Sequence, residues 1–258
     1  MGKAKEIQVR VIEAKVANQF VRANHYSGKN ATSTRLSMGC FIGGRMHGVM
    51  QFGSPIDRRK LIGLVHTSAG VPVLWNEFIE LNRMAFSEAM PRNSESRCLA
   101  IAFRLIRKNA PHVKWVVSFA DATQCGDGAI YRATGFKLTA IRESKDDLWR
   151  TPEHLGWGGM VSHRIAIQGS TGRVADWVLR TYGTRNVAIK RLVAEHGGEA
   201  LSGFQLRYIY LLDRTCRLAV PEIPYAAIDA AGAGMYRGVA QTRASRNIPK
   251  PPPTHGPR

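Results

Sequence analysis

Two residues near the middle of the chain could transfer protons. The stretch "SFADATQCGDGAIYRATGF", residues 118–136, begins like a buried strand and ends like a helix that runs into a glycine turn. Asp121 ends the expected strand, and catalytic groups of open sheets lie beyond the carboxyl ends of strands. Tyr131 lies on the expected helix, where its phenol could protonate a leaving group. A purely structural role stays open for each residue, because Asp121 can cap a turn and Tyr131 can pack in the core.

Other reactive side chains are weaker candidates. Cys125 has no histidine near it in the sequence to lower its pKa, so a structural role is favoured. His25, in "RANHYSGKN", can act as a general base or bind a metal, although a lone histidine usually does neither. Glu77 and Glu80 are three residues apart on an expected strand, which predicts opposite faces. Arg83 has the parity of Glu77, so these two can form a salt bridge.

The stretch "AFSEAMPRNSESR" predicts an anion site between a strand and a helix. The first amides of a helix are unpaired and carry the positive end of its dipole. Arg92 and Arg97 add positive charge there, and Ser94 or Ser96 can cap the helix. A pyrophosphate would fit this site, but every helix has such an end, so the motif alone is weak.

The order of expected elements predicts an α/β domain with a mixed central sheet flanked by helices. Residues 7–11 alternate like a strand, and residues 35–55 contain two apolar runs split by Gly43-Gly44, which indicates a hairpin. Residues 75–86 suit a half-buried strand. The pattern over residues 97–110 predicts a helix that stops at a proline, and residues 112–121 read as a buried strand.

Composition predicts three parts and an anionic partner. We expect a catalytic domain over residues 1–168, a basic helical and strand extension over 169–231, and a disordered Pro/Arg-rich tail over 232–258. The chain has 37 Lys+Arg against 19 Asp+Glu, a net charge of +18, which favours nucleic acid over a solubility or membrane role. No secretion signal or membrane span is evident, so we expect a cytoplasmic protein.

The four cysteines lie far apart and form no CxxC pair. Their spacing argues against both a disulfide framework and a zinc ribbon. We therefore expect reduced thiols.

The stretches "FIELNRMAF", "MPRNSESR", "WVVSFAD" and "AIYRATGF" together resemble the core of the GNAT N-acyltransferase fold over roughly residues 7–145. The resemblance implies that acetyl-CoA or a related acyl donor lies with its pyrophosphate on the loop and helix N-terminus. In ordinary GNAT proteins this loop carries glycines, whereas "RNSESR" carries serines. The implied cofactor-binding residues are Arg92, Asn93, Ser94, Ser96, Arg97 and Ser118.

More narrowly, "NHYSG", "FGSP", "ELNRMAF", "PRNSES", "SFAD", "GAIYRATGF" and "RYIYLLD" are similar to the phage Mom group. That resemblance implies an enzyme that converts the exocyclic amine of adenine in phage DNA to a carbamoylmethylated form, which protects the DNA from host restriction. It also implies double-stranded DNA as partner, the cytoplasm of the infected bacterium as location, and Fe(II) as a further cofactor.

The resemblance assigns roles to the candidate residues. Asp121, Tyr131, His25 and Glu80 become the catalytic candidates. The metal ligands become His25 with Asp121, or His25 with one of Glu77 and Glu80. The residues expected to contact DNA are Tyr26, Lys29, Arg58, Arg59 and Arg83, with Tyr26, Trp75 and Trp157 as candidates to stack on the base.

Two rival functions stay open. The chain could be an ordinary GNAT acetyltransferase acting on a protein or small-molecule amine, or a DNA-binding protein without catalysis. The oligomeric state also stays open, a homodimer included.

Overall fold

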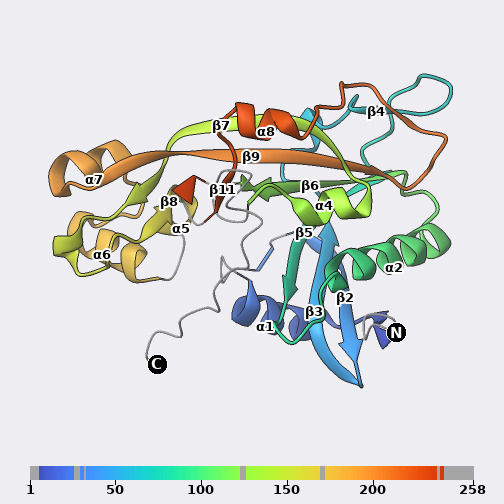
Figure 1. The fold of residues 1–258 in the computed structure, drawn as a ribbon, viewed down its shortest axis with the longest axis horizontal. Helices are drawn as coiled ribbons and strands as arrows, with labels where there is room; N and C mark the ends of the chain where they lie inside the picture. The colour runs from blue at the N-terminus through green and yellow to red at the C-terminus, as the bar shows by residue number, and fades with distance from the viewer. Residues whose placement is uncertain are drawn as a thin grey trace. The chain divides into compact units, whose positions relative to one another are not determined.

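The computed structural model describes residues 6–25, 30–31, 33–122, 126–168, 172–236 and 239–240, which form two compact units (Figure 1). Unit 1 comprises Met1–Ala120, Gly128–Ala140 and Leu206–Pro224, and unit 2 comprises Asp121–Asp127, Ile141–Gln205 and Tyr225–Arg258. Both units are discontinuous because the long strands β7 (Lys137–Arg150) and β9 (Glu199–Leu211) each begin in one unit and end in the other. The predicted boundaries at residues 168 and 231 stay predictions.

The sheet of unit 1 is mixed, which confirms the predicted α/β class. Its strands follow the order β1-β2-β3-β5-β6-β9-β7, in which neighbours from β1 to β5 are antiparallel and β5 and β6 are parallel. The expected hairpin is confirmed between β2 and β3, where Gly43 and Gly44 have φ of 55° and 79°, as a two-residue hairpin turn requires. Along the chain, the first six strands are β1 (Gln8–Val11), β2 (Thr34–Ile42), β3 (Arg45–Gly53), β4 (Val65–His66), β5 (Phe78–Phe86) and β6 (Trp115–Asp121). Of these, β4 lies outside the sheet just described.

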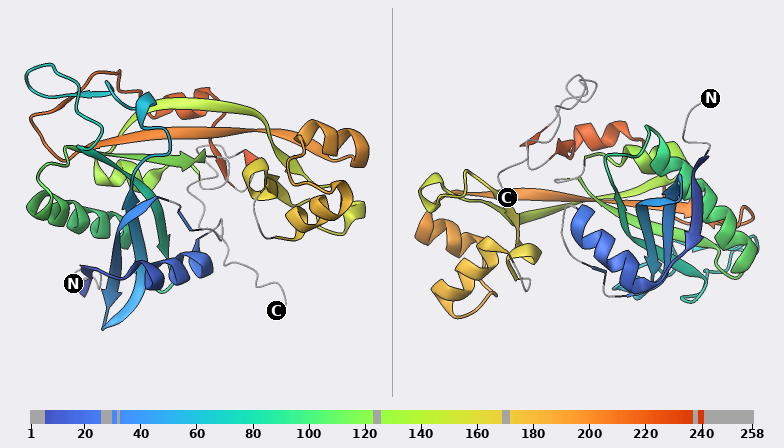
Figure 2. Two further views of the ribbon diagram at one scale, coloured as in Figure 1. Left: turned by 180° about the vertical axis from the view of Figure 1, so that it is seen from behind. Right: turned by 90° about the horizontal axis from the view of Figure 1, so that it is seen from below.

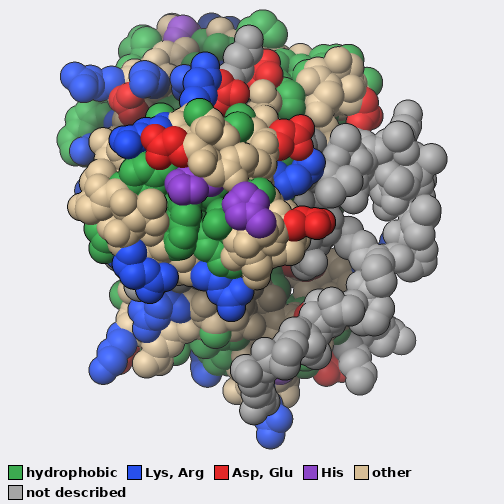
Figure 3. All heavy atoms as spheres, turned by 90° about the vertical axis from the view of Figure 1, so that its left-hand side faces the viewer, with side chains coloured by type: hydrophobic (Ala, Val, Ile, Leu, Met, Phe, Trp, Pro, Cys, Tyr) green, Lys and Arg blue, Asp and Glu red, His purple; other side chains and the backbone are tan. Residues whose placement is uncertain are grey.

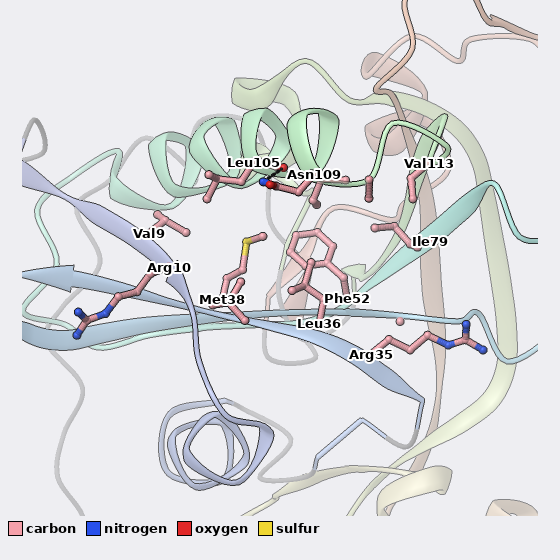
Figure 4. A pocket seen from close by; sticks show the side chains of 14 residues that line it. Val9, Arg10, Arg35, Leu36, Met38, Phe52, Ile79, Leu105, Asn109 and Val113 are labelled. Atoms are coloured by element: carbon pink, nitrogen blue, oxygen red, sulfur yellow. Dashed lines mark hydrogen bonds between the residues drawn. The ribbon is translucent and has the colours of Figure 1, made fainter.

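Helices cover both faces of this sheet. Helix α1 (Ala14–Asn24) buries Ala17 and Val21 against β3 and β5. Helix α2 (Ser94–Asn109) has an apolar stripe at helical spacing, and its Phe103 meets Phe52 edge to face at 6.5 Å. Figure 4 shows α1 and α2 on opposite sides of the strands. The other elements of unit 1 are the 3-10 turn η2 (Arg58–Lys60), α4 (Ala129–Thr134) and β10 (Arg217–Leu218).

An apolar cavity of about 520 Å³ lies between α2 and the sheet. It is lined mainly by aliphatic and aromatic side chains from β1, β2, β3, β5 and α2, with Arg10 and Arg35 among the lining residues (Figure 4). None of the residues predicted to form the site lines it. The cavity is therefore separate from the candidate chemistry described below.

Unit 2 has a core of its own, in which Trp149, Val178 and Leu192 are fully buried. Several of its basic side chains are paired with carboxylates, as in Arg150–Glu199. On the face of the molecule in Figure 3, basic and acidic side chains are likewise interspersed. Its further elements are η3 (Glu153–Leu155), β8 (Val161–His163), α5 (Arg164–Gln168), α6 (Arg173–Tyr182), α7 (Ile189–His196), α8 (Ala226–Ala230), β11 (Met235–Tyr236) and β12 (Val239–Ala240).

Within the part of the chain that the structure describes, no helix has the length and apolar character needed to cross a membrane. Cys40, Cys98 and Cys216 are buried free thiols, as the spacing of the cysteines predicts. Cys125 lies outside the described residues.

Candidate active site

A β-bulge in β5 brings Glu80 and Arg83 to the same face of the sheet. Glu80 pairs with Gly53 of β3, and Arg83 pairs with Gln51. Gly53 and Gln51 are two residues apart and share a face, so their partners share it too. The extra residue in β5 is Asn82, at the register shift. The prediction that Arg83 lies on the face opposite Glu80 is therefore wrong.

Glu77 does not belong to the strand. It lies in the turn before β5, and its carboxylate accepts a hydrogen bond of 2.9 Å from the Leu74 amide. The expected strand over residues 75–86 therefore begins only at Phe78. Of the two glutamates, Glu80 alone lies on the sheet.

Glu80, Arg83 and His25, each half-buried, form a group that we call the buried cluster to distinguish it from charged groups at the surface. Burial raises the pKa of the Glu80 carboxyl to about 7, although the Arg83 charge and a hydrogen bond from Asn82 oppose this. Burial, with a further contribution from Arg83, lowers the pKa of His25 to about 4. His25 follows the last residue of α1, and its amide donates to the Val21 carbonyl. At neutral pH His25 is therefore neutral, and Glu80 is poised between its two forms.

Polar groups surround this cluster on β2 and β3. The Gln51 amide donates to Asn18 of α1 at 2.9 Å and to Ser37 at 3.3 Å. Side-chain oxygens of Thr34, Gln51 and Asn82 are buried without a hydrogen-bond partner in the structure. Unpartnered buried acceptors are costly and call for an explanation such as a bound water or ligand. The face around Glu80 is therefore polar enough to receive a hydrogen-bonding substrate.

Gly53 is required at this point by close packing. A Cβ atom there would run into the Ser33 carbonyl and come within 2.7 Å of the Asn82 side-chain oxygen. The glycine of the "FGSP" motif thus lets β2 approach β3 beside Glu80.

Strands β5 and β6 part directly after Glu80. Their register covers Phe78–Glu80 against Trp115–Val117, while β5 continues to Phe86 and β6 to Asp121. Ser118, the first residue after the paired stretch, is fully buried. Its hydroxyl lies 3.3 Å from the Leu81 carbonyl oxygen and 2.9 Å from the Tyr131 hydroxyl. The Ser118 side chain thus connects β6 to β5 where their backbone hydrogen bonding ends.

Tyr131 is held in place from several sides. Its ring stacks on Tyr208 at 4.9 Å and meets Phe136 edge to face at 5.2 Å. Because a hydroxyl has a single proton, Ser118 can donate to Leu81 while Tyr131 donates to Ser118. The packing and the hydrogen bond to Ser118 hold the phenol in one position.

The N-terminus of α2 retains the features of an anion site. Asn93 precedes the helix with φ of 67°, the left-handed conformation that a glycine would adopt more easily. Asn93 makes no side-chain cap. The hydroxyls of Ser94 and Ser96 donate back to the Pro91 and Asn93 carbonyls and do not cap the helix as predicted, since a capping oxygen would accept from a helix amide. Arg92 and Arg97 are exposed on either side.

The remaining predicted residues fall outside this arrangement. Asp121 ends β6, three residues after Ser118, and is half-buried, but it belongs to unit 2. Arg58 and Arg59 lie on η2, in the segment between β3 and β5. Tyr26 and Lys29 lie outside the described residues. Among the described residues, no three His, Cys, Asp or Glu side chains come together as a metal site would require.

Sequence reasoning missed three members of this site, Gln51, Asn82 and Thr34. Gln51 gave a signal, since it is a polar residue inside the apolar run "GVMQFG". Asn82 gave none, because the register shift that makes it matter is a property of strand pairing.

The sequence is similar to those of known proteins. A model of the Mom protein family matches residues 6–227. The methylcarbamoylase Mom of Escherichia phage Mu is 36% identical over 145 residues, which cover 55% of this chain and 56% of that protein. The chain thus aligns with about half the length of this curated relative.

Solved structures with similar folds include acetyltransferases. A GNAT-family acetyltransferase from Streptococcus pneumoniae has a TM-score of 0.39 and 9% identity, covering 80% of this chain and 99% of its own. One from Elizabethkingia anophelis, solved with acetyl-CoA bound, has a TM-score of 0.34 and 11% identity, covering 78% of this chain and 97% of its own.

Proposed function

Because the chain belongs to the Mom protein family, we propose that it converts the exocyclic amine of adenine in phage DNA to a carbamoylmethylated form. The modified base would shield the DNA from host restriction enzymes. Such a protein acts on double-stranded DNA in the cytoplasm of the infected bacterium. The net charge of +18 supports a polyanionic substrate.

One observation carries the proposal. Glu80 and the hydrogen-bonded pair Ser118–Tyr131 lie where β5 and β6 separate. Glu80 belongs to the last paired row of the two strands, and Ser118 follows directly on the other strand. The Ser118–Tyr131 hydrogen bond then ties α4 to this opening. A carboxyl with a raised pKa and a fixed phenol, each held where the two strands part, are the groups that an acid–base site requires.

Each of these groups has a role in the proposed reaction. The lone pair of the adenine amine is delocalised into the ring, so attack on an electrophilic carbon requires removal of an N–H proton. Glu80 accepts this proton in its ionised form, which its pKa of about 7 makes available at neutral pH. Tyr131 donates to the leaving group or orients it, and Asp121 remains a further candidate for either task.

An acyl-CoA fits the N-terminus of α2. The uncapped first turn and the flanking arginines suit a pyrophosphate, and the left-handed Asn93 replaces the glycine that the loop lacks. Bound there, an acyl-CoA would supply an activated carbon. The product joins nitrogen to a methylene carbon, which plain acyl transfer does not make, so we route no bond-making step through this group.

Iron does not fit the described residues. His25 is neutral at neutral pH and could ligate a metal, but no three His, Cys, Asp or Glu side chains come together among the residues described. We therefore assign His25 to the buried cluster alone.

The test is to express the protein in bacteria, digest the DNA to nucleosides and measure their masses. We expect a deoxyadenosine heavier by one carbamoylmethyl group. Tyr131→Phe should lower its yield, whereas Tyr182→Phe, which removes a hydroxyl bonded to Glu195 in unit 2, should not. An acetylated protein or small molecule with unmodified DNA would indicate the ordinary acetyltransferase instead. Equal yields from both tyrosine variants would reject the proposed site.

A further inference from the structure

The segment between β3 and β5, residues 54–77, exposes an unusual set of apolar side chains. Ile56 is 93% exposed and Trp75 51% exposed, and Ile62, Val71 and Leu74 are exposed as well. In Figures 1 and 2 the segment extends beyond the ends of the strands that it joins. Single exposed apolar residues are ordinary, but a group of them marks an interaction surface.

This segment, which we call the wedge loop, is firmly anchored. Leu61, Val65 and Val73 are buried in a core cluster with residues from β5, β6 and β9. Its strand β4 pairs with β10 through His66–Arg217 and Val65–Leu218, and the Val73 amide bonds the Val65 carbonyl at 3.0 Å. The exposed side chains are therefore carried on an ordered frame and are not the tip of a loose loop.

Cationic groups stand beside the exposed apolar ones. Arg58, Arg59 and Lys60 follow one another on η2, and Lys60 pairs with Asp57 at 2.9 Å. The Arg58 guanidinium lies 4.8 Å from the centre of the Trp75 ring. A guanidinium stacked on an indole still presents N–H donors at its edge, as contact with a phosphate requires. Ile56, Ile62 and Trp75 share one hollow with Asp57 and the two arginines.

We propose that the wedge loop binds duplex DNA, with Arg58 and Arg59 on the phosphates and Ile56 and Trp75 inserted against the bases. Proteins that unstack DNA insert apolar side chains at a base step and hold the flanking phosphates with cations. The two arginines of the loop and the net charge of +18 on the whole chain complement DNA. The proposal rests on the proposed function, since an enzyme acting on adenine must first take the base out of the stack.

The place of the loop in the sheet suits this task. Its first residue follows Gly53 and its last precedes Phe78, so the Gly53–Glu80 pair lies at the base of the loop. The wedge loop therefore begins next to the strand pair that carries Glu80, the proposed general base. A base unstacked by the wedge would leave the duplex near the polar face that carries Glu80.

Two measurements on the purified full chain test the wedge independently of catalysis. The probe is a DNA duplex with 2-aminopurine in place of adenine, whose anisotropy reports binding and whose fluorescence rises on unstacking. The double variant Ile56→Ser, Trp75→Ser should bind about ten-fold more weakly and lose most of the fluorescence rise, with the salt dependence unchanged. The double variant Arg58→Gln, Arg59→Gln should reduce the slope of log K against log salt by about 2.

Val11→Ser is the matched control, because Val11 is 64% exposed but lies on β1. It should match the parent in both assays. The proposal is rejected if the Ile56→Ser, Trp75→Ser variant binds and unstacks the DNA like the parent, or if Val11→Ser weakens binding and unstacking as much. It is also rejected if the only effect of the apolar variant is to convert a dimer into a monomer in sedimentation. If the wedge variants behave as expected while DNA in cells carries no modified adenine, the proposed function fails and the DNA-binding surface stands.

Discussion

Two clusters in this molecule combine a glutamate, an arginine and a histidine, yet their glutamates have opposite pKa shifts. In unit 2, Glu195 accepts hydrogen bonds from Arg191 at 2.7 Å and from Tyr182 at 2.6 Å, and His196 contacts the Tyr182 hydroxyl at 2.9 Å. We call this the surface cluster. Arg191 and then Tyr182 lower the pKa of Glu195, while burial and then Glu195 raise the pKa of Tyr182 to about 12.

In the buried cluster of unit 1 the same residue types give the reverse result. Burial outweighs the charge of Arg83 at Glu80, so the pKa of Glu80 rises to about 7. At His25 burial and then the Arg83 charge act together and lower the pKa to about 4. One Arg83 guanidinium nitrogen donates to the Asn82 carbonyl at 2.8 Å. Arg83 acts on the pKa of Glu80 through its charge, whereas Arg191 also bonds its glutamate directly.

The difference teaches which cluster can do chemistry. A carboxylate that accepts two strong hydrogen bonds at the surface is stable as an anion and has little tendency to take up a proton. A carboxyl at which the effect of burial exceeds that of its charge and hydrogen-bond partners changes protonation near neutral pH, as a general base must. Residue types alone therefore do not identify the site, and the balance of burial and pairing does.

The largest expected effect is on activity. Glu80→Gln keeps the size and hydrogen bonding of the side chain but cannot accept a proton, so adenine modification should fall by about 10²–10⁴-fold. Mass spectrometry of nucleosides from expressing cells measures this. Glu195→Gln is the matched control and should leave the yield unchanged. Comparable losses in the two variants would abolish the distinction between the clusters.

The second prediction concerns stability against pH. Because the folded-state pKa of Glu80 is raised, the folded protein binds more protons than the unfolded chain between pH 4.5 and about 7. The contribution of Glu80 to stability therefore declines as pH rises through this window. Glu80→Gln removes that decline and should stabilise the protein by about 1–3 kcal/mol at pH 8 relative to its effect at pH 4.5.

Urea unfolding of parent and variant at both pH values measures this difference. His25 acts with the opposite sign in both proteins, since its lowered pKa costs stability as pH falls from 6.5 toward 4. Comparing the variant with the parent cancels that contribution. A difference in unfolding free energy that stays constant with pH would mean that the Glu80 carboxyl is not desolvated.

The hairpin, the long helix and the strand before Asp121 could be predicted from the sequence. Each has a strong local signal, such as Gly43-Gly44 or the apolar stripe that ends before Pro111. Local patterns also led to Tyr131 on a short helix. These elements depend on periodicity and turn chemistry, which neighbouring residues determine.

The composition of the buried cluster could not be predicted in the same way. Strict alternation separates Glu80 from Arg83, and only the pairing of β5 with β3 reveals the extra residue at Asn82. Likewise, the contact of Ser118 with Tyr131 joins residues 13 apart through the parting of two strands. Register and strand divergence are tertiary properties, so the sequence could suggest these residues but not their grouping.

The third prediction tests how far the charge of Arg83 lowers the pKa of His25. Its charge is the second cause, after burial, of the lowered pKa of His25. Arg83→Met keeps most of the apolar stem and removes the charge, so the His25 pKa should rise from about 4 while staying below its ordinary value. NMR titration of the imidazole protons measures this. A His25 pKa unchanged by Arg83→Met would show that burial alone sets it.

The smallest expected effect is in the surface cluster. Arg191 and Glu195 lie four residues apart on α7, with side chains 60% and 42% exposed, so solvent screens their attraction. A double-mutant cycle with Arg191→Gln and Glu195→Gln, measured by urea unfolding in low salt, should give a coupling close to the limit of measurement. It should shrink further at high salt. A large coupling that persists at high salt would mean that the surface cluster is shielded from water as the buried cluster is. The contrast between the two clusters would then no longer depend on burial.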